Sequence, residues 1–551
     1  MVKSKPKRDM WSGITITFLV LFTIFLIIPL FGILRQSVID PEEGLSLKHF
    51  LRFFSQAYYS RTILNSFKVT VAITVVTLII GIPFAYFYSF YRLKGAKILF
   101  VVSILCVMSA PFIGAYSWIL LLGRSGVITQ FFKNVLGIQI GSIYGFGGIL
   151  VVQALKLFPL VFIYMNGAFK NIDRSLIEAS ANLGSVGVNR FFRVILNLSM
   201  PTILAASLLV FMRAFADFGT PLLIGEGYRT FPVEIYNQYL GENGTDYNFA
   251  AAISVIAIVI TALVFFVQKW ATSHYQFSIS ALTPIEKKEP KGIRGVLMYL
   301  YCYLLVAIAF VPQLYVIYLS FRNSDQAIFK EGYSLNNYRV AADKLLGRSI
   351  NNTLILGLGS LVIIIVLSIL IAYLVVRRRS VLNNLIDTLS MIPYIMPGSV
   401  IGIALVIAFS RPPLVLTGTM AIMIISFVIR RMPYSIRAAN ATLMQIPISI
   451  EEASISLGTS KLKTFTHITV PMMSSGIISG AILSWVSIVT ELSSSIILYN
   501  NRTITLTMSA YVAISRGNYG LACAFSAVLT ALTSISLLVY LYISKSEDIK
   551  L

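Results

Sequence analysis

Residues Ile14–Leu34 read ITITFLVLFTIFLIIPLFGIL, an apolar run without a charged residue. A helix of about 20 residues crosses about 30 Å of hydrocarbon, so this run is long enough to span a bilayer. Four basic residues between positions 3 and 8 precede the run, and Gly32–Arg35 does not resemble the small-residue cleavage site of a signal peptide. We therefore interpret the run as a first membrane span that begins in the cytoplasm.

The composition of the whole chain agrees with a membrane location. Hydrophobic residues make up 57% of its 551 residues and charged residues only 12%, whereas a soluble domain carries about 25% charged residues. Runs of spanning length recur about twelve times, and each must be helical because lipid offers its backbone no other partner. The expected spans are 14–34, 63–90, 98–122, 147–167, 200–224, 249–268, 296–320, 351–376, 384–409, 413–430, 471–497 and 518–543. We predict an all-α integral membrane protein with about twelve transmembrane helices.

The basic residues orient this bundle. The chain carries 44 basic and 22 acidic residues, a formal net charge of +22. If every run spans once, the basic clusters fall in the loops of one side, which is the cytoplasmic side by the positive-inside rule. These residues are Arg92, Lys94, Lys97, Lys170, Arg174, Arg190, Arg193, Lys269, Lys287, Lys288, Lys291, Arg294, Arg377, Arg378, Arg379, Arg430, Arg431, Arg437, Lys461 and Lys463. The pattern predicts a multi-pass protein of the cell (inner, cytoplasmic) membrane with both termini cytoplasmic. It offers no single basic face for nucleic acid.

The runs fall into two halves. The polar segment 270–295 interrupts the pattern and indicates a cytoplasmic linker between residues 1–269 and 296–551. Similar hexapeptides, RTILNS at 61–66 and RSINNT at 348–353, precede the second span of each half. Because six spans are an even number, both halves enter the membrane in the same orientation, which makes a parallel repeat of two six-helix halves. A transport path at the axis of such a repeat would be built from both halves.

A second repeat lies in a cytoplasmic loop of each half, near residues 173–197 and 447–471. It reads EASANLG at 178–184 and EASISLG at 452–458. The glutamate suits the start of a short helix, where it complements the helix dipole. The two small residues that follow allow a partner to approach closely, and the glycine ends the helix without a steric penalty. These residue types fit a short docking helix.

The repeat resembles the EAA loop of binding-protein-dependent ABC importer permeases, with Ser180 and Ser454 in place of the second alanine. The resemblance covers nearly the whole chain and implies the ABC importer permease fold. It further implies two copies of an ATPase subunit, one for each loop, and an extracytoplasmic binding protein that delivers the solute. ATP and Mg would be used by the ATPase, and this chain would bind no cofactor. The ATPase-coupling residues that it marks are Glu178, Ala179, Gly184, Glu452, Ala453 and Gly458.

The two loops differ in the position of their prolines. We call the difference in numbering that maps Gly184 onto Gly458 the repeat shift. The same shift maps Asn197 onto Pro471, whereas the proline of the first loop is Pro201. Because proline favours the first turn of a helix, we expect the next span of the first half to begin about one turn late. The first loop would then dock with a different geometry.

Three further stretches narrow the resemblance: ADFGTP at 216–221, FPVEIY at 231–236 and TELSS at 490–494. They are similar to the ferric-iron branch of these permeases, and the 2-aminoethylphosphonate permeases are close relatives with similar stretches. This resemblance favours ferric iron as the solute. It leaves 2-aminoethylphosphonate, thiamine or another small solute as alternatives.

Other function classes find less support in the residues. The dipeptide Gly-Lys never occurs, so the chain lacks a lysine-bearing P-loop. Energy must come from a partner ATPase or from an ion gradient. A gradient-driven secondary transporter with parallel halves is therefore the alternative class, although it has no need of a duplicated coupling motif. An enzyme is not indicated, because His49, His274 and His467 are scattered over different loops and no nucleophile stands beside a base.

Three ionisable residues stand out within the predicted spans: Arg213, Asp217 and Glu491. Charge within the membrane is costly and usually faces a cavity or a partner. Arg213 and Asp217 stand at positions i and i+4, so an ion pair on one helix face is one interpretation. Asp217 and Glu491 also hold matched places in the two halves, so the other is that both line the translocation path. Two carboxylates would suit ferric iron, which prefers oxygen ligands, better than a phosphonate, although no set of metal ligands is assigned.

Overall fold

The computed structural model describes residues 10–40, 44–108, 111–139, 141–241, 246–274 and 286–544. Within these residues helices dominate, and the strands form two short antiparallel hairpins, β1–β2 and β3–β4. The predicted all-α fold is confirmed.

The first half of the chain contains α1 (Met10–Phe22), the π-helix η1 (Thr23–Ile27), α2 (Ile28–Val38), β1 (Ile39–Asp40), β2 (Gly44–Leu45), α3 (Lys48–Ser55), α4 (Ala57–Phe90), α5 (Ala96–Met108), α6 (Pro111–Leu122), α7 (Val127–Val135), α8 (Phe146–Lys170), α9 (Arg174–Asn182), α10 (Gly187–Arg190), η2 (Phe191–Ile195), α11 (Leu196–Leu198), α12 (Met200–Phe215), α13 (Gly219–Ile224), α14 (Phe231–Leu240) and α15 (Tyr247–His274). The second half contains α16 (Gly292–Ser320), β3 (Arg322–Asp325), β4 (Ile328–Tyr333), α17 (Asn336–Lys344), α18 (Leu346–Arg377), α19 (Val381–Ile395), α20 (Gly398–Phe409), α21 (Met420–Gln445), α22 (Ile448–Ser456), α23 (Lys461–Thr464), η3 (Phe465–Thr469), α24 (Val470–Met472), α25 (Ser474–Val489), α26 (Ser495–Leu498), α27 (Leu506–Ser515) and α28 (Tyr519–Ser544).

In the described part of the chain, eight helices are long and apolar enough to cross a membrane, or up to eleven if each of three bent helix pairs is one span. The third predicted span of each half is not continuous. The run 384–409 is divided into α19 and α20, which are bent by 112°. Met396 at the break is extended and Pro397 follows it. A residue that precedes proline avoids the helical conformation, which explains the break. The run 98–122 is likewise divided into α5 and α6.

The helices of the two halves repeat in the same order, with one change of spacing. α4 ends at Phe90 and α18 at Arg377, and this separation in sequence equals that between the starts of α6 and α20. The starts of α8 and α21, Phe146 and Met420, are closer together in the sequence and are related by the repeat shift. The spacing changes between α6 and α8, where the first half holds the additional helix α7. The chain is thus an element-by-element repeat with one insertion.

The chain divides into two compact units whose boundaries differ from those of the two halves. Unit 1 comprises Met1–Leu51, Ile235–Ile256 and Ser320–Lys550, and unit 2 comprises Arg52–Glu234 and Ala257–Leu319. Helices α1 and α2 therefore belong with the helices of the second half, and α16 belongs with those of the first. The predicted linker 270–295 is described only in part, because 275–285 lie outside the described residues.

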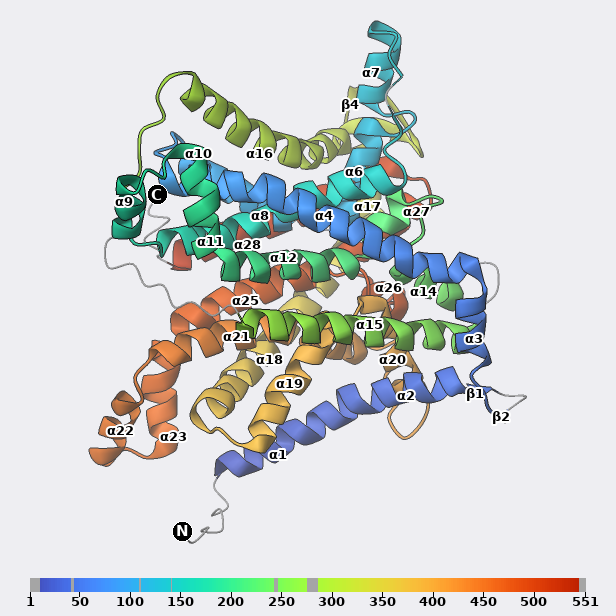
Figure 1. The fold of residues 1–551 in the computed structure, drawn as a ribbon. Coiled ribbons are helices and arrows are strands. Elements are labelled where there is room, and N and C mark those ends of the chain that lie inside the picture. The colour runs from blue at the N-terminus through green and yellow to red at the C-terminus, as the bar shows by residue number, and fades with distance from the viewer. Residues whose placement is uncertain are drawn as a thin grey trace. The chain divides into compact units, whose positions relative to one another are not determined.

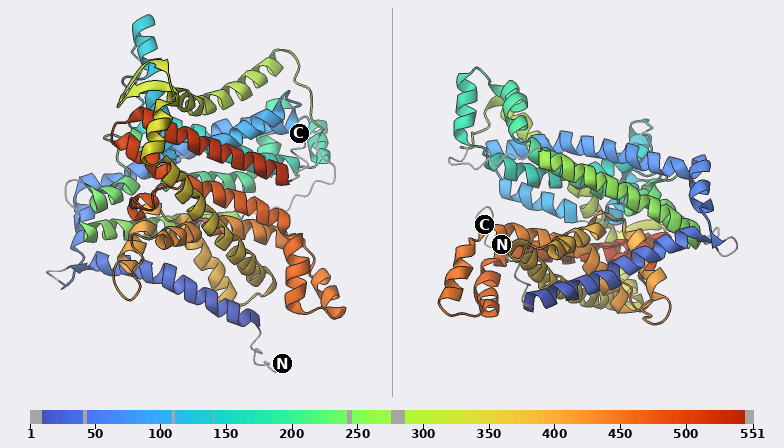
Figure 2. Two further views of the ribbon diagram at one scale, coloured as in Figure 1. Left: turned by 180° about the vertical axis from the view of Figure 1, so that it is seen from behind. Right: turned by 60° about the horizontal axis from the view of Figure 1, so that its bottom comes forward.

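Specific contacts hold these exchanged helices in place. In unit 1, the Thr15 hydroxyl of α1 donates to Asn383 Oδ1 of α19 at 2.9 Å, and α2 packs along α20. In unit 2, the Tyr301 hydroxyl of α16 donates to the Ile80 carbonyl of α4 at 2.6 Å. Figure 2 shows α1 and α2 beside the helices of unit 1 in both views.

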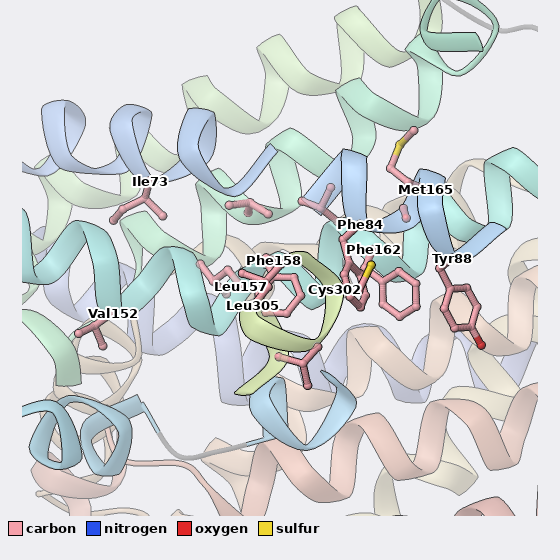
Figure 3. Packing of buried hydrophobic residues seen from close by; sticks show 14 of the residues in the cluster. Ile73, Phe84, Tyr88, Val152, Leu157, Phe158, Phe162, Met165, Cys302 and Leu305 are labelled. Atoms are coloured by element: carbon pink, nitrogen blue, oxygen red, sulfur yellow. The ribbon is translucent and has the colours of Figure 1, made fainter. Parts of the chain in front are cut away.

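The core of unit 2 is aromatic where α4 and α8 meet. The ring of Phe84 lies 5.6 Å from that of Phe158 and 4.7 Å from that of Phe162, edge to face. Gly81 lets the two helices approach, because a Cβ there would lie 2.8 Å from Val161. Figure 3 shows Cys302 of α16 in the same cluster. Close packing at small residues is the usual way in which membrane helices associate.

Candidate functional site

The helices of the two predicted coupling loops are built alike. α9 begins at Arg174 and α22 at Ile448, two positions that the repeat shift relates. The same shift relates α10, η2 and α11 to α23, η3 and α24, up to breaks at Ser199 and Met473. Figure 1 shows α22 and α23 side by side at one end of α21 and α25. Each half therefore presents the same helix–turn–helix arrangement.

The expected late start of the next span in the first half is wrong. α12 begins at Met200 and α25 at Ser474, and the repeat shift relates these positions too. Proline suits the first turn of a helix, where the N–H groups lack partners, but the π-helix η3 runs into α24 without a break. Pro201 lies in the first turn of α12, whereas Pro471 lies in the first turn of α24. The position of the proline is therefore no measure of where the span begins.

The argument that Glu178 and Glu452 complement the helix dipole is also wrong, because each is the fifth residue of its helix. The start of α9 is capped by Asp173, whose Oδ1 accepts from the Ser175 N–H at 2.8 Å. The acidic residue in the first turn of α22 is Glu451. Glu178 and Glu452 are exposed on the sides of their helices, where they are open to a partner.

Only one of the two small residues in each motif faces outward. Ala179 and Ala453 are exposed, whereas Ser180 and Ser454 are 8% and 7% exposed. The Ser454 hydroxyl lies 2.9 Å from that of Thr464 in α23. Ser454 therefore ties α22 to its own loop, whereas the Ser180 hydroxyl donates to the Ile177 carbonyl within α9. In both helices the alanine is left on the outer surface.

Both short helices end at a glycine that adopts a left-handed conformation. Gly184 has φ 79° and Gly458 has φ 90°, a region that favours glycine because it lacks a Cβ. A Cβ at either position would meet no atom within 4 Å. Leu183 and Leu457, just before the glycines, are each 87% exposed. The open glycine and the exposed leucine form the same outward surface in both loops.

A buried ion pair that the sequence did not reveal anchors α22. Arg377 Nε, at the end of α18, donates to Glu451 Oε1 at 2.9 Å. The Tyr373 hydroxyl donates to Glu451 Oε2 at 3.2 Å. The side chains of Arg377 and Glu451 are only 9% and 8% exposed. At the matched positions the first half has Phe90 and Ile177, which pack in an apolar cluster. The two short helices, α9 and α22, are thus held by different forces.

α9 is tied to the linker instead. Arg174 Nε donates to Glu178 Oε1 at 2.6 Å, and Arg174 Nη1 lies 2.7 Å from Glu286 Oε1. Glu178 and Glu286 together hold the pKa of Arg174 above its ordinary value. Both ion pairs are exposed, and exposed pairs contribute little to stability. They nevertheless join the glutamate of the motif to the described end of the predicted linker.

Asp217 lies in the break between α12 and α13, beyond the helix that carries Arg213. Its Oδ2 accepts from Gln153 Nε2 at 2.8 Å and from the Thr220 N–H at 3.3 Å. Lys156 of α8 interacts electrostatically with both Asp217 and Arg213. Lys156 is an isolated cation within the apolar run 147–167, and it was not among the residues predicted from the sequence. The carboxylate of Asp217 therefore has neutral and cationic neighbours.

Glu491 holds the matched place in the break between α25 and α26. It is 3% exposed and forms ion pairs with Arg430 and Arg431 of α21. Its Oε1 also accepts from the Ser494 N–H at 3.1 Å. The sequence analysis had placed both arginines in a cytoplasmic loop, but α21 continues to Gln445. The carboxylate offsets one of the two guanidinium charges, which helps to explain how Arg430 can be buried, whereas Arg431 is partly exposed.

Lys156 and Arg430 are related by the repeat shift, as Asp217 and Glu491 are. Each half thus places a basic side chain at this position of its long helix: Arg430 forms an ion pair with Glu491, and Lys156 interacts electrostatically with Asp217. Both carboxylates already have partners in the protein. Their presence is therefore no physical reason to expect a cation rather than an anion as the solute. In the part of the chain that the structure describes, no group of three or more His, Cys, Asp or Glu side chains is placed to hold a metal ion.

Comparison with protein families gives a match in both halves. The profile of the family described as binding-protein-dependent transport system inner membrane component matches residues 77–275 and 345–546. Each match includes one of the short helices, α9 or α22, and the carboxylate, Asp217 or Glu491, that follows it. The internal repeat is thus also a repeat of one family domain.

Individual relatives are similar over most of the chain. The ferric transport system permease protein FbpB of Actinobacillus pleuropneumoniae is 29% identical over 527 residues, which cover 94% of this chain and 76% of that protein. The putative ferric transport system permease protein FbpB 1 of Haemophilus influenzae is 29% identical over 490 residues, 87% of this chain and 76% of that protein. The Fe(3+)-transport system permease protein FbpB 2 of Haemophilus influenzae is 24% identical over 475 residues, 86% of this chain and 87% of that protein.

Proposed function

The chain belongs to the family of binding-protein-dependent transport system inner membrane components, and from this premise we propose that it is the permease subunit of an ABC importer driven by a separate ATPase. One observation carries the proposal. The family profile matches both halves, and each match contains a short exposed helix of the same construction. A gradient-driven carrier has no use for such a pair of docking helices. The chain is a multi-pass transport protein rather than an enzyme.

We propose that two copies of one ATPase subunit bind the chain, one at α9 and one at α22. The exposed residues Glu178 and Ala179, and their counterparts Glu452 and Ala453, would contact the ATPase. Closure of the ATPase dimer on ATP and Mg would move both short helices, and α12 and α25 would carry that movement into the membrane. Both termini would lie on the cytoplasmic side, together with the two docking helices.

Ferric iron is the proposed solute, delivered by an extracytoplasmic binding protein. The support comes from the names of the relatives, which are ferric transport permeases similar over most of the chain. We keep the assignment of Asp217 and Glu491 to the translocation path as a prediction, with Arg213 as a neighbour of the first. Because each carboxylate has basic neighbours, the choice of iron over 2-aminoethylphosphonate rests on the relatives alone.

Reconstitution tests the proposal directly. The chain is purified with the ATPase that accompanies it and inserted into liposomes that contain ATP and Mg. Binding protein loaded with radioactive ferric iron is then added outside. We expect uptake of iron that needs both ATP and the binding protein, and an ATPase-to-chain ratio of two to one.

Two controls separate the alternatives. An ATPase variant that binds but does not hydrolyse ATP should abolish uptake. Labelled 2-aminoethylphosphonate, offered with its own binding protein, should not be taken up. Iron uptake driven by a proton or sodium gradient without the ATPase would refute the importer mechanism, whereas ATP-driven uptake of the phosphonate alone would refute only the choice of solute.

A further inference from the structure

Helix α7 has no counterpart in the second half. The connection from α6 to α8 covers residues 123–145, whereas the connection from α20 to α21 covers only 410–419. The second half therefore makes the same turn between the same helices without an added helix. The fold of a half therefore does not need α7, which leaves the helix available for another function.

α7 is amphipathic, and its apolar side is covered only in part within its unit, where Ile128 packs against the core cluster. With 3.6 residues per turn, its apolar residues fall on one side of the helix and its polar residues on the other. The apolar residues are Val127, Ile128, Phe131, Phe132 and Val135, and the polar ones are Thr129, Gln130, Lys133 and Asn134.

None of the residues of α7 is buried. Val127, Phe131 and Val135 are 55%, 53% and 63% exposed. Leu136 and Ile138, just after the helix, are 52% and 54% exposed. A contiguous apolar surface of this kind is rarely left to water and marks an interaction with protein or membrane.

The connections of α7 place it at a membrane surface. α8 leads from the α7 end of unit 2 to the α9 end, so α7 and the first coupling helix lie at opposite ends of a membrane-spanning helix. Figure 1 shows α7 standing clear of α4 and α8, far from α9 and α10. If α9 faces the cytoplasm, α7 emerges on the outer side.

Aromatic and basic side chains surround the base of α7. The guanidinium of Arg124 lies 5.2 Å from the ring centre of Tyr144 and 2.8 Å from Glu226. The rings of Phe146 and Tyr228 are 5.5 Å apart. Tyrosine is enriched at both membrane–water interfaces, and arginine serves as an interfacial anchor of membrane helices, so the base of α7 has residues suited to a membrane interface.

We propose that α7 lies in the outer interface of the bilayer, with Phe131 and Val135 among the acyl chains and Lys133 at the lipid phosphates. An amphipathic helix with an aromatic apolar side and a basic polar side binds such an interface. Residues 127–139 carry Lys133 as their single charge, which gives little of the polar rim that a protein interface has. The helix would thus fix the depth of α6 and α8 against the lipid surface.

Spin labels on the full chain in lipid nanodiscs test this inference. The native cysteines, Cys106, Cys302 and Cys523, are buried, and they are replaced by alanine in the parent protein. Single labels are placed by Phe131→Cys and Val135→Cys on the apolar side. Matched controls, Thr129→Cys and Lys133→Cys, lie on the polar side of the same helix.

We expect the two apolar-side labels to collide several-fold more often with oxygen, which concentrates in lipid, than with a water-soluble nickel chelate. The two polar-side labels should show the reverse preference. All four labels accessible to nickel would mean that α7 stands in water, and the proposal would fail. Immobilisation of the apolar-side labels only when the binding protein is added would overturn it in favour of a protein-docking helix. Neither outcome depends on which solute is transported.

Discussion

Arg377 and Glu451 join the end of α18 to the first turn of α22 through a 2.9 Å hydrogen-bonded ion pair that is almost fully buried. Arg377 Nη2 also donates to the Ile446 carbonyl at 2.7 Å, just before α22. One side chain thus holds both the approach to the coupling helix and its first turn. The equivalent positions in the first half, Phe90 and Ile177, are apolar.

Arg377→Gln should therefore leave Glu451 as a buried charge without its cation. Breaking a buried pair on one side costs about 3–5 kcal/mol, so we expect a lower thermal unfolding midpoint and less uptake per ATP hydrolysed. The double variant Arg377→Phe with Glu451→Ile copies the first half and should recover most of the lost stability, because replacing both partners by apolar groups is often neutral. A single variant that matches the parent in midpoint and in coupling ratio would show that the pair is no anchor.

Gly184→Leu and Gly458→Leu should reduce coupling more than they reduce folding. A left-handed conformation costs a residue with a Cβ about 1–2 kcal/mol. A Cβ added at either glycine would meet no atom of the chain within 4 Å. We expect normal membrane insertion, weaker retention of the ATPase during purification and a large loss of uptake. Gly167→Ala, at an open position without a positive φ, is the control and should behave like the parent.

Glu178→Lys and Glu452→Lys should act through the partner rather than through their own helices, since both side chains are exposed near mid-helix. We expect both variants to fold normally and to lose ATP-dependent uptake. Glu178→Lys should also repel Arg174, which now pairs with Glu178. Glu331→Lys, an exposed charge change in the β3–β4 hairpin, serves as the control. Undiminished uptake in both motif variants would show that these loops do not couple.

Glu491→Gln should be far more damaging than Asp217→Asn. The first change leaves Arg430 and Arg431 without their carboxylate in a buried site, with an expected cost of about 3–5 kcal/mol. The second keeps an oxygen that can still accept from Gln153 and Thr220. We therefore expect Glu491→Gln to lower the amount of assembled complex.

Uptake per assembled complex then separates structure from transport for the same two carboxylates. Asp217→Asn should leave assembly intact and slow uptake if Asp217 lines the path. The double variant Asp217→Asn with Arg213→Gln distinguishes a structural role, since full recovery there would identify a simple ion pair. Unchanged uptake for Asp217→Asn alone would remove this carboxylate from the path.

The sequence predicted the helices well because long apolar runs leave little choice of structure in lipid. The predicted span 518–543, for example, nearly coincides with α28 at Tyr519–Ser544. The prediction failed where a charged side chain within a helix is paired with a residue that lies far away in the sequence. In the sequence, Arg430 and Arg431 look like the end of a span. The structure shows that both pair with Glu491, which follows the next long helix, and that α21 continues past them.

In the candidate site, too, some features could be predicted from the sequence and others are set by packing. The residue types of the repeated motif predict a short helix that ends at a glycine, and the left-handed Gly184 and Gly458 agree with that end; its role in coupling stays a prediction. The exposure of Ala179 beside a buried Ser180 could not be predicted, because the packing of α9 on its own loop sets it. Lys156 could have been found by applying the repeat shift to Arg430, but only if Arg430 had first been placed within a helix.

The exchange of first helices between the compact units has a consequence for synthesis. α1 and α2 pack with α19 and α20 in unit 1, and the ribosome must continue from Val38 to Val381 before α19 begins. At about 5–20 residues per second that interval lasts roughly 20 to 70 s. Throughout it Thr15 has no Asn383 to contact. α1 and α2 are thus synthesised first but are among the last helices to make their native contacts.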